Sequence, residues 1–289
     1  MNEKWYHRSG PRGDVVISTR VRLARNLRGM PFPDRMSLDQ RQKVCQMVRS
    51  ALLCSNSAIR DDFEYIEMAS LSPVQAQSLA ERHLISPEFC ENRQGRALLL
   101  KKDESVSIML CEEDHVRIQV IQPGLQLEEA YDLADKIDTL LDSQLHFAFD
   151  DRLGYLTQCP TNLGTGMRAS LMMHLPALQA TGMIAELYKA VSKIGLVFRG
   201  LYGEGSKPKG AIYQLSNQIT LGISELDALQ NLSSIAGQVI EQEKGAAAQL
   251  DKPLLEDRIP SGCCKMPVSS APTSLWTVCP TSGWALPWV

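Results

Sequence analysis

Residues 159–168 contain three kinds of group that can do chemistry on an anion: a thiol, a pair of glycines and a guanidinium. The stretch reads Cys-Pro-Thr-Asn-Leu-Gly-Thr-Gly-Met-Arg. Gly164 and Gly166 allow the backbone to approach a ligand closely and to present N–H groups to it. Arg168 offers a planar fork of donors that suits phosphate oxygens, and this cationic environment favours the thiolate form of Cys159. A Gly-Thr-Gly segment taken alone is most often only a turn, so other segments have to support a phosphate-binding function.

Two more arginines are expected on one face of a strand near the N-terminus. Residues 18–23 read Ser-Thr-Arg-Val-Arg-Leu, and alternation places Arg20 and Arg22 on one face and Val21 and Leu23 on the other. Neighbouring side chains on one strand face are about 6–7 Å apart along the strand, so two arginines there repel each other unless an anion lies between them. The pattern predicts either an anion site or a solvated basic edge.

A carboxylate and an arginine are expected to share a face of another strand. Residues 111–117 read Cys-Glu-Glu-Asp-His-Val-Arg, and alternation places Glu113, His115 and Arg117 together. Such a face could hold a cationic substrate beside an anionic one. Three consecutive acids are also common in simple turns.

A fourth segment presents one carboxylate between glycines. Residues 199–206 read Arg-Gly-Leu-Tyr-Gly-Glu-Gly-Ser, with Glu204 at the centre of the glycine-rich part. The composition predicts a mobile loop that carries Glu204 to a ligand, although a plain hairpin loop fits equally well.

The elements that must position these groups follow from capping residues and apolar spacing. Ser37 with Gln40, and Ser72 with Pro73 and Gln75, are typical helix starts. The second of these helices ends near His83, where a histidine usually has a surface or capping role. We expect helices over residues 37–53, 72–84, 127–145, 168–179 and 224–250, and strands over 97–100, 106–110, 196–202 and 211–215. In the last helix the apolar stripe is expected to be Leu226, Leu229, Leu232, Ile235 and Val239.

The four segments, in this order, closely resemble the ATP:guanidino phosphotransferases, the family of creatine kinases, arginine kinases and bacterial protein-arginine kinases. The resemblance covers roughly residues 12–259 and is greatest to the bacterial protein-arginine kinases. Only about a dozen residues precede the strand arginines, where phosphagen kinases have a helical domain, and Tyr202 stands where they have a second arginine. Cys111 departs from the family's asparagine. The resemblance implies an α+β, glutamine-synthetase-like fold, with a large antiparallel sheet flanked by helices.

The resemblance also implies site residues and cofactors. ATP would be the phosphoryl donor, and Mg²⁺ would arrive with the nucleotide, because no carboxylate cluster suggests a metal cage made by the protein alone. Glu113 and Glu204 would orient the acceptor guanidinium and take its proton, and Cys159 would tune it electrostatically. The implied nucleotide-binding residues are Ser18, Thr19, Arg20, Val21, Arg22, His83, Arg117, Arg168, Ala169, Ser170, Leu171, Met172, Arg199, Gly200, Leu201, Tyr202, Gly203 and Glu204.

The implied substrates are proteins that bear exposed arginines, marked or regulated in stress response and proteolysis. An activator protein and the Clp protease system are the partners that the family resemblance suggests. Two alternatives stay open: a phosphagen kinase that acts on free arginine or another small guanidine, and a catalytically silent binding module.

Composition limits the class of protein. The chain has 289 residues, of which 44% are hydrophobic and 22% charged, as in ordinary globular proteins. A formal net charge of −3 argues against a dedicated nucleic-acid binder. The eight cysteines are irregularly spaced, which indicates reduced thiols. Neither a signal peptide nor an apolar run long enough for a bilayer is evident, so we expect a cytoplasmic protein.

Residues 260–289 differ sharply from the rest of the chain. They contain three of the four tryptophans, and Lys265 is their single charged residue. Such a stretch lacks helical periodicity and is poor material for a soluble surface. We expect residues 1–259 to form the catalytic domain and 260–289 to be an out-of-frame, disordered tail. This tail would replace the family's C-terminal regulatory region, which leaves dimerisation undetermined.

Overall fold

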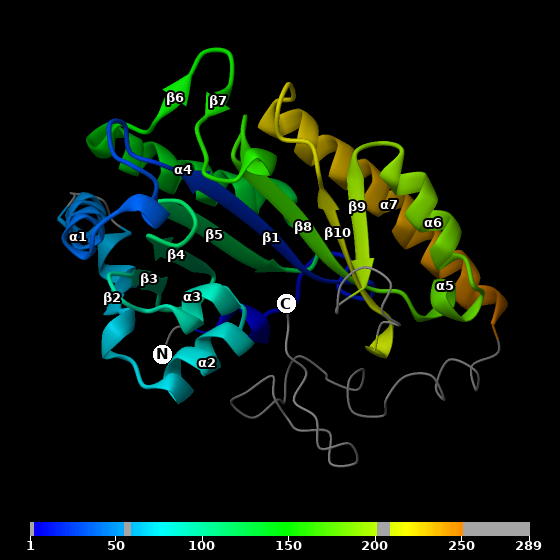
Figure 1. The fold of residues 1–289 in the computed structure, drawn as a ribbon. Coiled ribbons are helices and arrows are strands. Elements are labelled where there is room, and N and C mark those ends of the chain that lie inside the picture. The colour runs from blue at the N-terminus through cyan, green and yellow to red at the C-terminus, as the bar shows by residue number, and fades with distance from the viewer. Residues whose placement is uncertain (1–2, 55–58, 201–208, 251–289) are drawn as a thin grey trace.

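An eight-stranded sheet dominates the fold, and every neighbouring pair of its strands is antiparallel (Figure 1). The computed structural model describes residues 3–54, 59–200 and 209–250. The strand order is β2-β3-β4-β5-β1-β8-β10-β9, and β6 and β7 form a separate hairpin. The bounds are β1 Val16–Arg25, β2 Phe63–Glu67, β3 Ala97–Lys101, β4 Val106–Leu110, β5 Val116–Pro123, β6 Phe149–Asp150, β7 Gly154–Tyr155, β8 Met167–His174, β9 Leu196–Gly200 and β10 Ile212–Asn217.

Strand β1 lies in the middle of the sheet, between β5 and β8. Arg22 of β1 lies opposite Gln119 of β5 and opposite Arg168 of β8. Because residues at i and i+2 share a face of a strand, Arg20, Arg117 and Ser170 lie on the same face as this row. The pairing therefore brings three sequence-distant segments onto one surface.

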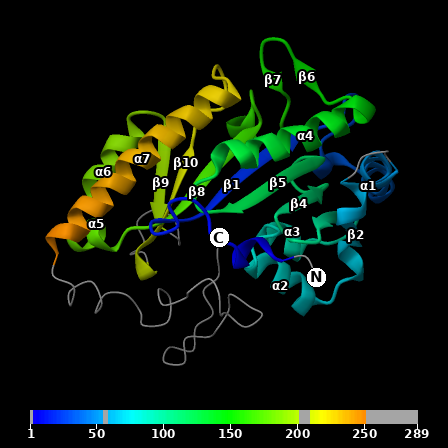
Figure 2. The same ribbon diagram turned by 180° about the vertical axis from the view of Figure 1, so that it is seen from behind.

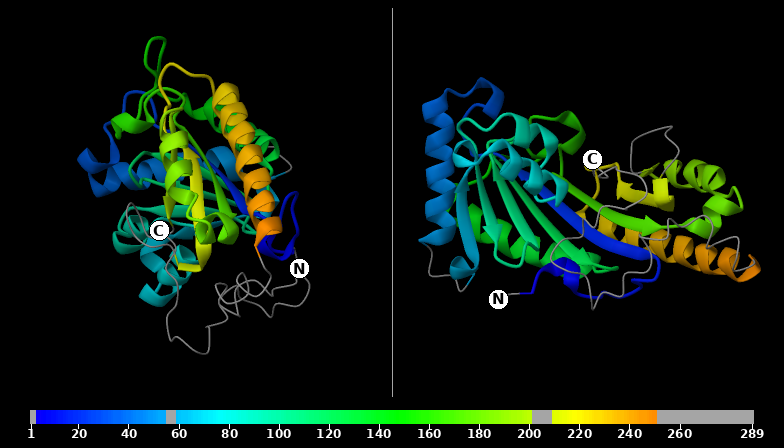
Figure 3. Two further views of the ribbon diagram at one scale, coloured as in Figure 1. Left: turned by 90° about the vertical axis from the view of Figure 1, so that its right-hand side faces the viewer. Right: turned by 90° about the horizontal axis from the view of Figure 1, so that it is seen from below.

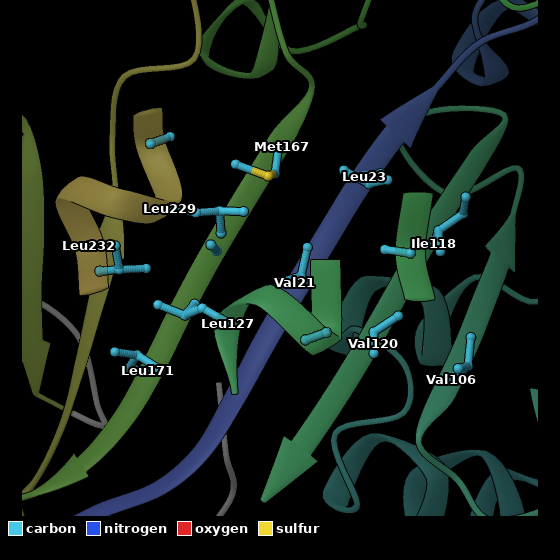
Figure 4. Packing of buried hydrophobic residues seen from close by; sticks show 14 of the residues in the cluster. Val21, Leu23, Val106, Ile118, Val120, Leu127, Met167, Leu171, Leu229 and Leu232 are labelled. Carbon is cyan, nitrogen blue, oxygen red and sulfur yellow. The ribbon is translucent and has the colours of Figure 1, made fainter. Parts of the chain in front are cut away.

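Helices α1, α4 and α7 cover the opposite, apolar face of the sheet (Figure 2). Seen edge-on, α7 runs along one side of the strands (Figure 3). Val21, Ile118 and Leu171 point from their strands toward Leu127 of α4 and Leu229 of α7 (Figure 4). In the described ranges, no helix has both the length and the apolar character needed to cross a membrane. The bounds are α1 Leu38–Leu53, α4 Leu127–Leu145, α5 Pro176–Ala180, α6 Ile184–Ser192 and α7 Glu225–Gln249.

Two short helices, α2 (Pro73–Glu81) and α3 (Pro87–Glu91), lie on the arginine-bearing face. They form a second apolar cluster in which Phe89 of α3 packs with Leu98 of β3 and Met109 of β4. They therefore cover the β3–β4 part of this face, next to the central strands that carry the arginines.

The capping residues begin their helices as predicted. The Ser37 hydroxyl accepts from the Gln40 amide, and the Gln40 side chain accepts from the Ser37 amide. The same reciprocal pair joins Ser72 and Gln75 at the start of α2. Helix α2 ends at Glu81, earlier than expected, because the chain turns sharply at His83, whose φ is +61°.

The predicted helix over residues 168–179 is wrong. Residues Met167–His174 form strand β8, and a helix begins only at Pro176. Met167, Ala169, Leu171 and Met173 are all buried, which is the alternation of a strand with one covered face. The apolar residues also fit a helical spacing, and pairing with β1 and β10 decides between the two.

The predicted apolar stripe of α7 is wrong at its first residue. Leu226 is 61% exposed, whereas Leu229 and Leu232 are buried. The buried face runs through Ala228 and Ala236, which lie beside the predicted positions. Small alanines allow the helix to approach the sheet closely, so they belong to the core although their side chains are short.

Leu229 and Leu226 form a matched pair for testing this packing. We expect Leu229→Ala to lower the free energy of unfolding by about 2–5 kcal/mol, because it leaves a cavity under α7. Leu226→Ala should change it by less than about 0.5 kcal/mol, because that side chain is already in solvent. Urea unfolding followed by circular dichroism measures both. Equal losses in the two variants would contradict the assigned orientation of α7.

Candidate active site

A pocket of about 480 Å³ lies where β1, β5, β8 and the loop after β7 meet. It brings together predicted site residues from three of the four segments. They are Arg22, Glu113, Arg117, Cys159 and Arg168. The pocket thus holds cationic, carboxylate and thiol groups within one small volume.

Arg20, Arg22 and Arg168 form a cationic wall on this face of the sheet. Among the described residues, no carboxylate lies within ion-pair distance of Arg20, Arg22 or Arg168, although Arg20 Nε donates to Ser170 Oγ at 3.4 Å. Burial, and the nearby charges of Arg168 and Arg117, lower the pKa of Arg20 to about 10. Burial and the charge of Arg20 lower the pKa of Arg22 well below its usual value. An anion bound here would relieve this repulsion.

Arg117 is held between two carboxylates of the acidic turn. Its Nη1 lies 2.5 Å from Glu112 Oε2, and its Nη2 lies 2.8 Å from Glu113 Oε2. The Ser86 hydroxyl fixes the other oxygen of Glu112. Glu112 is 5% exposed and Glu113 is 37% exposed. Glu112 therefore anchors Arg117, while Glu113 is the carboxylate that a ligand can reach.

His115 does not share a face with Glu113 and Arg117, contrary to the prediction. Its ring is buried, where Nδ1 accepts from the Leu27 amide at 2.9 Å and Nε2 lies 2.8 Å from the Pro31 carbonyl oxygen. Strand β5 begins only at Val116, so the alternation of a strand does not extend back through the acidic turn. The imidazole serves the fold rather than the pocket.

Cys159 lies at the start of a short 3-10 helix, Pro160–Asn162, and its Sγ is 3.1 Å from Thr161 Oγ1. Burial and the charge of Arg199 lower the pKa of Arg168, and the nearby Cys159 opposes that shift. The thiol and the arginine therefore line the same pocket within electrostatic reach of each other.

The two glycines of this segment also allow close contact with the protein's own chain. Gly164 has φ +107°, and a Cβ there would lie 2.1 Å from the carbonyl oxygen of Thr220. Gly166 has φ +61°, and its Cβ would lie 2.7 Å from the carbonyl oxygen of Ala24. In both cases a backbone carbonyl oxygen is a close neighbour, and at Gly166 the Arg25 guanidinium is equally close. The glycines allow the loop to pack against β1 and the chain beyond β10.

The remaining predicted nucleotide residues divide by strand face. Ser18 and Met172 lie on the arginine-bearing face. His83 lies close to Arg20, and burial together with the charge of Arg20 lowers the pKa of His83. Arg199 of β9 lies close enough to Arg168 to lower the pKa of Arg168. Four residues point into the apolar core instead, and they are Thr19, Val21, Ala169 and Leu171. Leu201, Tyr202, Gly203 and Glu204 lie outside the described residues, as does the tail 260–289, and Gly200 ends β9.

Several residues that line the pocket were not predicted from the sequence. They come from the loop after β1, helix α3, the turn before β3 and the loop after β7, and they are Asp34, Glu88, Arg96 and Gln158. No motif links these positions, because tertiary contacts alone bring them together. In the part of the chain that the structure describes, no group of three or more His, Cys, Asp and Glu residues is placed to hold a metal ion.

A family model and individual relatives both match this chain to the same protein family. Residues 43–246 match the family model described as ATP:guanido phosphotransferase, C-terminal catalytic domain. The protein-arginine kinase of Caldanaerobacter subterraneus subsp. tengcongensis is 49% identical over 249 residues, which is 85% of this chain and 74% of that protein. The protein-arginine kinase of Brevibacillus brevis is 48% identical over 258 residues, which is 88% of this chain and 72% of that protein.

Solved structures show the same fold. The substrate-free duplicated taurocyamine kinase from Schistosoma mansoni superposes with a TM-score of 0.69 and 31% identity, over 80% of this chain and 33% of that one. A lombricine kinase superposes with a TM-score of 0.73 over 88% of this chain and 76% of that one. It is 23% identical, so it supports the fold alone.

Arg22 and Arg25 lie on the same strand and provide an opposed pair of tests. Arg25 is buried and ion-paired with Asp138 at 2.9 Å, whereas Arg22 faces other arginines. We expect Arg22→Met to raise the free energy of unfolding of the ligand-free protein by about 1 kcal/mol, because it removes a repelled, half-buried charge. Arg25→Met should lower it by about 3–5 kcal/mol, because it leaves Asp138 unpaired. Urea titrations measure both, and a loss of stability in Arg22→Met would contradict the charge repulsion described above.

Proposed function

The chain belongs to the ATP:guanido phosphotransferase family, and we propose that it is a protein-arginine kinase. It transfers the γ-phosphoryl group of ATP to arginine side chains of proteins. The observation that carries this proposal is the pocket, in which uncompensated arginines face the accessible carboxylate of Glu113 and the thiol of Cys159. The names of the relatives support a protein-bound arginine as the acceptor.

The arginine wall binds the phosphates of ATP. A transferred phosphoryl group carries negative charge on its equatorial oxygens, and positioned guanidiniums stabilise that charge. Arg22 and Arg168 lie opposite each other across β1 and β8, so their forks can hold neighbouring oxygens. Arg20 and Arg199 extend the wall along the same face. Mg²⁺ would arrive with the nucleotide and would supply further positive charge to offset that of the phosphates.

The acceptor is a guanidinium, which is a cation and not a nucleophile until it loses a proton. Glu113 binds its N–H fork and accepts that proton as the nitrogen attacks the γ-phosphorus. The bond between the γ-phosphorus and the bridging oxygen breaks, and ADP leaves with the bond's electron pair. Arg117 orients Glu113 through its 2.8 Å contact. We propose Glu204 as the second carboxylate and Cys159 as a thiol that tunes the acceptor without forming a covalent intermediate.

We also propose partners and a domain extent. Residues 1–259 would form the catalytic domain, and an activator protein and the Clp protease system would act with it. These proposals rest on the resemblance of the sequence motifs to the protein-arginine kinases.

Incubation with Mg-ATP and casein, with free arginine in parallel, tests the proposed activity. We expect acid-labile phosphoarginine on casein, detected by mass spectrometry under neutral conditions, and little transfer to free arginine. Efficient transfer to free arginine alone would indicate a phosphagen kinase. Nucleotide binding with no transfer to either acceptor would indicate a silent binding module.

Replacing Glu113 tests the proton acceptor. We expect Glu113→Gln to lower turnover by at least about 10²-fold, because an amide cannot take the proton, while nucleotide affinity stays near that of the parent. Phosphoryl-transfer rates and calorimetric titration with ATP measure the two effects. Glu129→Gln, on the first turn of α4, is the matched control. Turnover equal to the parent's in Glu113→Gln would remove this residue from the mechanism.

Replacing Arg168 tests the phosphate contact. We expect Arg168→Lys to raise the KM for ATP by about tenfold or more, because an ammonium cannot reproduce a planar fork of donors. Arg152→Lys, in the exposed turn between β6 and β7, controls for the general effect of the substitution. Kinetic constants measured over a range of ATP concentrations compare the three proteins. Identical constants would show that Arg168 is only a solvated charge.

A further inference from the structure

Two consecutive residues at the end of β1, Arg25 and Asn26, hold the two ends of residues 156–165, here called the Cys159 loop. We infer that Arg25 and Asn26 are positioning residues that fix Cys159 relative to Glu113. The inference rests on the proposed function, because it concerns the alignment of the acceptor guanidinium between those two groups. Neither residue lines the pocket.

Asn26 holds the first end of the loop. Its side-chain Nδ2 donates to the Leu156 carbonyl oxygen at 2.9 Å and to Asp114 Oδ1 at 2.6 Å. Its Oδ1 accepts from the His115 amide at 2.9 Å. Asn26 is 2% exposed, and each of its polar side-chain atoms has a partner. One amide side chain therefore joins β1, the acidic turn and the loop.

Asp114 links Asn26 to the backbone beside the two pocket groups, Glu113 and Cys159. The oxygen that accepts from Asn26 also accepts from the Gln158 amide at 2.8 Å. Asp114 directly follows Glu113, and Gln158 directly precedes Cys159. A single carboxylate oxygen thus fixes the neighbours of both pocket groups, and Asp114 itself is completely buried.

Arg25 holds the other end of the loop. Its Nη1 donates to the carbonyl oxygens of Thr165 and Ala24, both at 3.0 Å. Asp138 of α4 fixes the guanidinium from behind through Nε at 3.1 Å and Nη2 at 2.9 Å. The Tyr155 ring lies over it, with 3.5 Å between Cζ and the ring centre. A Cβ added at Gly166 would lie 2.7 Å from Arg25 Nη1 and 2.7 Å from the Ala24 carbonyl oxygen, so the chain at Gly166 packs directly against this guanidinium.

This network suits a positioning role because Arg25, Asn26, Asp114 and Asp138 are all buried, and among the described residues each of the two carboxylates leaves only one oxygen without a hydrogen-bond partner. Hydrogen bonds in a low-dielectric interior are strong and directional, so they define one loop conformation. Phosphoryl transfer to a guanidinium needs the nitrogen in line with the leaving oxygen, and a misplacement of about 1 Å can cost about 10²-fold in rate. The arginines of the wall stand on the paired strands β1, β8 and β9 rather than on the loop itself. Loosening the loop should therefore affect the acceptor side and leave nucleotide binding intact.

Asn26→Asp tests the inference with almost no change of shape. The new carboxylate loses the donor to Leu156 and places negative charge against Asp114. We expect the amides of residues 159–165 to exchange with solvent deuterium at least about tenfold faster, with unchanged exchange in β3 and β4. We expect kcat to fall about 10²-fold while the ATP dissociation constant stays within about twofold. Asp114→Asn keeps an acceptor oxygen for the Gln158 amide, so its loop exchange should stay near the parent's.

Glu243→Gln is the control for general destabilisation. Glu243 is also a buried carboxylate with two amide partners, Ala177 and Leu178, but it lies between α7 and α5. The Glu243→Gln substitution should lower the midpoint temperature of unfolding without changing deuterium exchange in the Cys159 loop. Unchanged loop exchange in Asn26→Asp, or a rise shared equally by the whole sheet, would overturn the inference. The exchange measurement needs no substrate, so an absence of transfer by the parent protein would overturn the proposed function alone.

Discussion

The register of β1 between β5 and β8 is the constraint on which the rest of this structure depends. It sets Arg22 opposite Arg168 and directs Val21 and Leu23 into the core under α4. Side chains alternate along a strand, so a slip of one residue would bury the arginines and expose the apolar residues. The energetic cost of that slip fixes the register strongly. The hydrophobic face of β1 thereby positions the charges on its other face.

Much of this arrangement could be predicted, because it follows from local patterns. The alternation in β1 separates its arginines from its core residues, and Ser-x-x-Gln motifs begin α1 and α2. The failures occur where tertiary contacts override local preference. Residues 168–174 fit a helix on spacing, and two neighbouring strands make them β8. His115 leaves its expected face because the acidic turn precedes the strand.

Strand β1 carries arginines in opposite electrostatic surroundings. Arg25 has a carboxylate, two carbonyl oxygens and an aromatic ring around it, so its burial is compensated. Arg20 and Arg22 are close to other cations, and burial lowers their pKa values. Uncompensated charge is common where a protein awaits a ligand of opposite sign. The contrast separates the residues that build the scaffold from those that serve the chemistry.

The partial covering of the arginine-bearing face has a consequence for folding in the cell. Helices α2 and α3 cover the β3–β4 part of that face, and the central strands carry charged side chains there. A nucleotide bound to those strands, as proposed, would cover the exposed part of this face, and its phosphates would add negative charge beside Arg20, Arg22 and Arg168. Because such a ligand binds only the folded chain, it shifts the folding equilibrium by mass action. The metabolic state of the cell would then set not only how fast this protein works but how much of it is folded.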